Sequence, residues 1–75
     1  PGTIPTRILR ALRSLRAVAR GEVPALAGLS PRQAQDGLRA LLRRGLARRW
    51  GEGRVRLTTR GVRMALDGDE VTCGP

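Results

Sequence analysis

The side chains with the most specific hydrogen-bonding capacity are arginines and glutamines near the middle of the 75-residue chain. An arginine guanidinium can donate two parallel hydrogen bonds to guanine O6 and N7, and a glutamine amide can pair in a similar way with adenine N6 and N7. The candidates for base contact are Arg32, Gln33, Gln35 and Arg39. The alternative is that these are ordinary solvent-facing residues.

A second set of arginines follows directly. The formal net charge is +9 and every basic residue is an arginine, which favours a polyanionic partner, nucleic acid first. Contacts to phosphate hold a protein in register on a duplex without reading its sequence. We expect such contacts from Arg43, Arg44, Arg48, Arg49, Arg54 and Arg56, with Arg7, Arg10 and Arg60 as weaker candidates. The alternative for Arg54 and Arg56 is a charged edge strand that prevents aggregation.

Catalytic and metal chemistry has few suitable residues. The chain has no His and no Tyr, and three of its six acids lie in the last nine residues. Neither of the two serines has a recognisable base partner. Cys73 is the only cysteine, so neither an intramolecular disulfide nor a cysteine-based metal site can form. We expect no enzyme activity, no metal and no cofactor.

A single amphipathic helix over residues 31–44 would position the base-contact candidates. Ser30 is a favourable N-cap, and Pro31 suits the first helical position. Gly45 can end the helix in the left-handed conformation. The apolar side recurs at helical spacing and consists of Ala34, Leu38, Leu41 and Leu42, while Asp36 and the polar candidates fall elsewhere.

The neighbouring segments predict a frame for this helix. Apolar periodicity indicates a first helix from Thr6 to Arg20, and Pro24 can open a short helix before the turn at Gly28. A short helix, a turn with Gly and a longer capped helix form a helix-turn-helix. Alternating residues predict strands over 46–50 and 54–57, which two glycines join as a hairpin.

A last helix begins at Thr58 or Thr59 and fades by residue 67. The predicted fold class is therefore mostly helical α+β, a winged helix-turn-helix with three helices, a β-hairpin wing and a short C-terminal helix. The domain would span residues 1–66, and residues 67–75 would form an acidic, flexible tail.

The local sequence supports this fold. The run LRALLRRGLARRW followed by GEGRVRLTTRGVRMAL resembles the end of the recognition helix, the wing and the closing helix of MarR-like bacterial regulators. The matching residues are Leu41, Gly45, Leu46, Leu57, Thr58 and Gly61. The resemblance implies double-stranded DNA as partner, with recognition helix 31–44 in the major groove and wing 50–57 on the backbone or minor groove. The long dimerisation helices of that family have no counterpart here, so its dimer is not implied.

Two residues depart from the pattern. Asp36 stands where such helices often carry a polar or basic residue that faces DNA. It can repel phosphate, accept from a cytosine N4 amine, or pair with Arg32 or Arg39, and we favour the pairing. Gly37 lies inside the helix, where glycine is unfavourable, and either permits a close approach or is neutral.

The expected function is sequence-specific binding of double-stranded DNA by a bacterial or phage transcription regulator, in the cytoplasm at the nucleoid. A homodimer and a larger parent protein are both expected possibilities, and a membrane partner is not. The alternative is a winged-helix module for protein contacts or nucleic-acid handling in a larger assembly. Trp50 shares a strand face with Arg48, and either covers the core or hairpin base or stays exposed at an interface.

Overall fold

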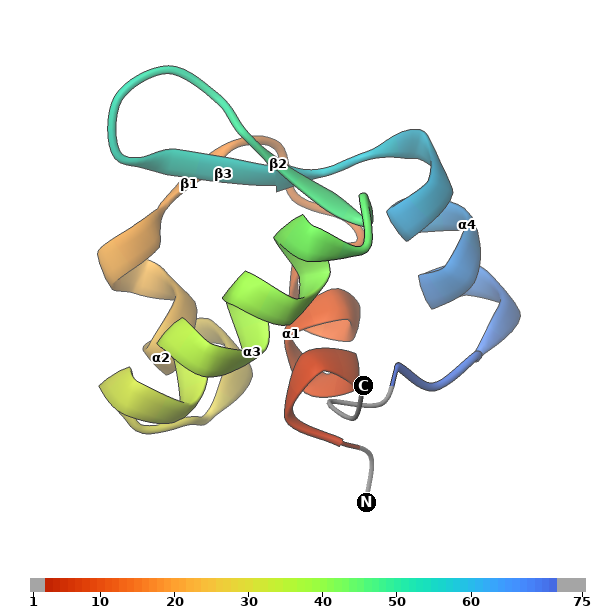
Figure 1. The fold of residues 1–75 in the computed structure, drawn as a ribbon, viewed down its shortest axis with the longest axis horizontal. Coiled ribbons are helices and arrows are strands. Elements are labelled where there is room, and N and C mark those ends of the chain that lie inside the picture. The colour runs from red at the N-terminus through yellow and green to blue at the C-terminus, as the bar shows by residue number, and fades with distance from the viewer. Residues whose placement is uncertain (1–2, 72–75) are drawn as a thin grey trace.

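Within residues 3–71, which the computed structural model describes, the chain forms four α-helices and a three-stranded antiparallel sheet (Figure 1). In chain order the elements are α1 (Ile4–Leu12), β1 (Val18–Ala19), the 3-10 turn η1 (Arg20–Glu22), α2 (Val23–Ala27), α3 (Pro31–Arg43), β2 (Ala47–Arg49), β3 (Arg54–Leu57) and α4 (Thr59–Asp67). This architecture confirms the predicted fold class, and the order of elements is winged-helix-like.

The sheet lies along one side of the helices (Figure 1). Its strand order is β1-β3-β2, so β2 is an edge strand. Val55 of β3 pairs with Val18 on one side, and Leu57 pairs with Ala47 on the other. Because side chains alternate along a strand, Val55 and Leu57 are buried against the helices while Arg54 and Arg56 lie on the outer face.

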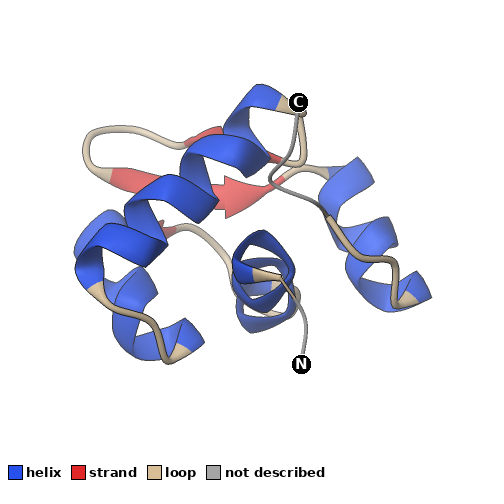
Figure 2. Cartoon of the chain, turned by 60° about the horizontal axis from the view of Figure 1, so that its bottom comes forward, coloured by secondary structure: helices blue, strands red, loops and turns tan. Residues whose placement is uncertain are grey.

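Helix α1 is the centre of the aliphatic core and contacts α2, α3 and α4 (Figure 2). Its side chains Ile8, Leu9 and Leu12 are almost completely buried, as is Leu41 of α3. A Cβ atom on Gly37 would lie 2.7 Å from both Ile4 Cγ2 and Ile8 Cδ1. Glycine therefore permits the close approach of α3 to α1, which was one of the two roles expected of it.

Helix α3 begins as the sequence predicts. The Ser30 hydroxyl accepts a hydrogen bond of 3.1 Å from the Gln33 amide, and the Gln33 side-chain oxygen accepts one of 3.0 Å from the Ser30 amide. This reciprocal capping box satisfies two backbone donors at the start of the helix. Pro31 occupies the first turn, and Gly45 has a φ of 72°, in the left-handed region.

The Leu-Thr-x-x-Gly run closes the hairpin onto α4. The Thr58 amide donates to the Leu46 carbonyl at 3.0 Å, and the Thr58 hydroxyl caps α4 by accepting from the Gly61 amide at 3.1 Å. A Cβ on Gly61 would overlap the Leu46 carbonyl oxygen. Only glycine therefore lets the first turn of α4 pack this tightly on the segment that leads into β2.

The predicted first helix from Thr6 to Arg20 is wrong at both ends. Helix α1 starts at Ile4, after the N-cap Thr3, and ends at Leu12. Val18 and Ala19 instead form β1 on the edge of β3, and the Arg20 amide donates to the Gly53 carbonyl at 2.9 Å. The helical spacing of apolar residues continued past residue 12, but pairing with β3 supplies non-local hydrogen bonds that the local pattern does not reveal.

The segment after α4 returns to α1. Asp67 is the last residue of α4, and Val71 is 2% exposed. The Val71 amide donates to the buried Thr6 hydroxyl at 2.7 Å, and the Val71 carbonyl accepts from the hydroxyls of Thr6 and Thr3. Nothing in the sequence pattern indicated this contact. The remainder of the expected flexible tail, with Cys73, lies outside the described residues.

Candidate nucleic-acid interface

The exposed side of α3 carries one charged line. Arg32, Asp36, Arg39 and Arg43 are all exposed and are spaced by four, three and four residues, which places them on one face of a helix. The buried side, opposite, is formed by Ala34, Gly37, Leu38 and Leu41. The predicted amphipathic division of this helix is thus confirmed, and the two arginine candidates for base contact lie on the outward side.

A basic groove lies between the C-terminal half of α3 and the edge strand β2. It has a volume of about 470 Å³ and is lined by four arginines and two apolar residues, namely Arg39, Arg43, Arg48, Arg49, Leu42 and Ala47. Residues from both predicted sets therefore meet here, because the turn at Gly45 folds β2 back beside the helix. We call this hollow, with its six lining residues, the α3–β2 groove.

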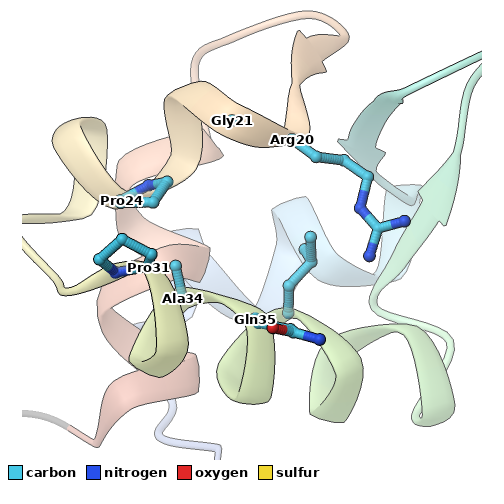
Figure 3. A pocket seen from close by; sticks show the side chains of 7 residues that line it. Arg20, Gly21, Pro24, Pro31, Ala34 and Gln35 are labelled. Carbon is cyan, nitrogen blue, oxygen red and sulfur yellow. The ribbon is translucent and has the colours of Figure 1, made fainter.

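A second hollow, of about 320 Å³, flanks the N-terminal half of α3 (Figure 3). Gln35 lines it from α3, and Arg20 lines it from η1 on the other side. Gln35 and Leu42 are seven residues apart, so this hollow and the α3–β2 groove follow the same flank of the helix. Arg20 was not among the predicted site residues, because the sequence pattern placed it at the end of a long first helix.

Two of the predicted residues have other roles or positions. The Gln33 side chain is used in the capping box with Ser30. Arg44 lines a different hollow, on the side of α4, together with Arg60 and Glu70. These two residues therefore stand apart from the groups that line the flank of α3.

The outer face of the hairpin carries the remaining predicted arginines. Arg48 and Arg56 are direct partners across β2 and β3, and Arg54 lies at the start of β3. The guanidinium groups of Arg48 and Arg56 both lie over the Trp50 ring. The ring centroid is 5.3 Å from Arg48 Cζ and 4.6 Å from Arg56 Cζ. Trp50 is 44% exposed and does not belong to the hydrophobic core. It therefore lies exposed on the outer face, beside the tip of the hairpin, and covers neither the core nor the base of the hairpin.

Asp36 remains exposed on the outward line of α3. Within the described part of the chain, no ion pair joins it to Arg32 or Arg39. The pairing that we favoured from the sequence is thus not formed, and a carboxylate stays among the arginines of this face.

No protein-family model matches the chain, and neither a curated protein nor a solved structure matches it. Its class is therefore defined by the fold, a small α+β domain with a winged-helix-like order of elements. Among residues 3–71, no helix is both long and apolar enough to cross a membrane. The same residues contain no group of three or more His, Cys, Asp or Glu that could hold a metal ion.

Proposed function

We propose that this chain binds double-stranded DNA in a sequence-specific way, as a transcription regulator or as the DNA-binding domain of one. Helix α3 would enter the major groove, and residues 50–57 would lie on the backbone or in the adjacent minor groove. The observation that carries the proposal is the α3–β2 groove, where Arg39 and Arg43 of the helix face Arg48 and Arg49 of the strand across one hollow.

The dimensions of α3 suit this role. A helix of 13 residues is about 20 Å long, and the major groove, about 12 Å wide, admits one α-helix. Arg32, Gln35 and Arg39 lie on its exposed side, where a guanidinium or an amide would meet base edges. Gln33 would contribute less to base contact, because its side-chain oxygen already accepts a hydrogen bond from the Ser30 amide.

Electrostatics supports a polyphosphate partner. The net charge of +9 attracts a polyanion over distances of about a Debye length, roughly 10 Å at moderate salt. The arginines of the groove and of the hairpin would neutralise several phosphates and release their counterions. A chain with this function needs no enzyme activity or cofactor, in line with its lack of His and Tyr.

The resemblance to MarR-like regulators supports a bacterial or phage regulator that acts at the nucleoid. The shared residues have clear physical roles here, since Thr58 caps α4 and Gly61 permits its close packing. A second copy or a larger parent protein would supply dimerisation or effector binding.

A second candidate function is a winged-helix module for protein contacts. It is favoured by Asp36, whose unpaired carboxylate faces outward where DNA phosphates would lie, and by Leu66, which is 68% exposed on α4. The same fold can serve both uses.

Titration of fluorescently labelled duplexes at several salt concentrations tests the proposal. We expect log K to fall linearly with log salt, by about 0.9 for each phosphate neutralised. Arg39→Ala should weaken binding, whereas the charge-matched control Arg63→Ala, at an exposed position of α4, should have little effect. Absence of duplex binding at moderate salt, despite the charge of +9, would favour the protein-contact module.

A further inference from the structure

The outer face of the hairpin holds an arrangement of like charges that is unfavourable on its own. Arg48 and Arg56 are opposite each other in the register of β2 and β3. Their side chains share the outer face, and like charges at directly opposed positions destabilise a sheet. Within residues 3–71, no carboxylate is paired with either guanidinium. A compensating anion from outside the chain would therefore stabilise this pair.

Trp50 holds the two guanidinium groups at one place. Both Cζ atoms are within the range of about 6 Å over which a cation is attracted to an aromatic ring. The backbone of Trp50 is held in the hairpin, because its amide donates a hydrogen bond of 2.9 Å to the Arg54 carbonyl. The hairpin tip is in turn tied to η1 by the bond from the Arg20 amide to Gly53.

The arrangement fits a phosphate group. A guanidinium presents a planar fork of donors that matches phosphate oxygens, and two such forks can share one phosphate. Arg48 also lines the α3–β2 groove, so an anion held by the pair would lie next to the surface that we propose for the duplex. A contact there would set the register of α3 on DNA.

We propose that Arg48 and Arg56 bind a single phosphate of the DNA backbone, and that Trp50 is a positioning residue that holds both for this contact. This inference rests on the proposed function as far as the source of the phosphate is concerned. The two arginines would thus share one phosphate, and the exposed tryptophan would orient them for it.

Sharing of one phosphate has a measurable signature in the salt dependence of duplex binding. Arg48→Ala or Arg56→Ala alone should lower the slope of log K against log salt by less than about 0.9, because the remaining guanidinium still neutralises the shared phosphate, and the double variant should lower it by only about 0.9. The free-energy costs of the two single changes should accordingly be non-additive. A double variant that loses about 1.8 from the slope would assign a separate phosphate to each arginine and overturn the proposal.

Trp50 itself reports on the site, because it is the only aromatic residue of the chain. Addition of a mixed-sequence duplex should change the tryptophan emission of the native chain, and this change should be lost in Arg48→Ala and Arg56→Ala. Arg13→Ala, which removes an exposed arginine at the C-terminal end of α1, is the matched control and should keep it. Unchanged emission at saturating duplex would show that Arg48, Trp50 and Arg56 do not contact the DNA. The proposed function would still stand in that case.

The positioning role is tested by graded substitutions of Trp50. Trp50→Leu should weaken duplex binding by about tenfold at low salt, the scale of one charge-assisted contact, and Trp50→Phe should restore part of it. Leu15→Ala, which also removes a partly exposed apolar side chain, should leave affinity unchanged. Circular dichroism and thermal unfolding show whether each variant is folded, and equal binding by Trp50→Leu and native chain would overturn the role.

Inorganic phosphate and the single strand of the same sequence distinguish the source of the anion. We expect weak emission changes with phosphate, strong ones with duplex, and weaker binding of the single strand. Response to phosphate without any duplex binding would contradict the DNA source and the proposed function together. Tighter binding of the single strand than of the duplex would indicate base stacking on Trp50 and would overturn the shared-phosphate assignment.

Discussion

The hydroxyl of Thr58 donates a hydrogen bond of 2.8 Å to the carbonyl oxygen of Gly45, 13 residues earlier in the chain. This bond joins the turn that ends α3 to the first turn of α4, and the whole hairpin lies between the two residues. The same hydroxyl accepts from the Gly61 amide, so one side chain both caps a helix and closes the hairpin. Strand β2, with its arginines, lies within the segment that this bond closes.

Replacement of Thr58 should therefore cost stability. Thr58→Ala removes an N-cap and a second hydrogen bond, and we expect the free energy of unfolding to fall by about 1–2 kcal/mol. Urea denaturation followed by circular dichroism measures this change. Thr59→Ala, at the neighbouring exposed position, is the matched control and should change it by less than about 0.5 kcal/mol. Equal effects of the two changes would contradict the role of Thr58.

A methyl group at Gly61 should be far less tolerable than one at Gly21. The Cβ of Gly61→Ala would overlap the Leu46 carbonyl, which is backbone and cannot move like a side chain, so we expect a loss of about 3 kcal/mol or more. At Gly21 a Cβ would meet no atom within 4 Å, and Gly21→Ala should be neutral or slightly stabilising. Thermal unfolding of both variants checks the contrast. A folded, native-like Gly61→Ala would contradict the close packing of α4.

The buried hydroxyl of Thr6 should be needed to hold Val71. Thr6→Val keeps the shape but leaves the Val71 amide without its acceptor, at an expected cost of about 1–3 kcal/mol. Amide hydrogen exchange should show loss of protection at Val71 in this variant. Thr59→Val, at an exposed site, supplies the control for the threonine-to-valine change. Unaltered protection would indicate that Val71 is held by its apolar contacts alone.

Base contact and phosphate contact should separate in binding experiments. Arg32→Ala and Arg39→Ala should reduce the discrimination between a preferred duplex and a mismatched one, by about 1–3 kcal/mol for a bidentate contact. Arg54→Ala, on the hairpin, should weaken all duplexes to a similar degree. Mobility shifts with matched and mismatched duplexes measure both effects. An equal loss on every sequence from Arg39→Ala would contradict its proposed role in reading bases.

Replacement of Asp36 should strengthen DNA binding, whereas replacement of the arginines should weaken it. Removal of an unpaired negative charge from the outward line of α3 by Asp36→Asn should raise affinity for all duplexes, by about threefold at low salt. Asp67→Asn, on α4, changes the net charge equally and should have a smaller effect. If Asp36 instead accepts a hydrogen bond from a cytosine amine, affinity for the preferred sequence should fall while that for other sequences rises.

Local patterns in the sequence determined the central helix, the hairpin and the last helix. Ser30 and Pro31 define the start of α3 through interactions within a few residues, and so does Thr58 for α4. Alternation of side chains likewise indicated that Arg48 and Trp50 share one face of a strand. These features are short-range, so residue types and spacing are enough to predict them.

Only the tertiary structure decided the features that join distant segments. The pairing of Val18 with Val55 and the contact of Val71 with Thr6 link residues 37 and 65 positions apart, so no local periodicity records them. The same holds for the meeting of Arg39 with Arg48 in one groove, and for the register that sets Arg48 opposite Arg56 beside Trp50. The sequence by itself determined which arginines were available, whereas folding decided which of them share a surface, because long-range packing and strand register depend on the whole chain.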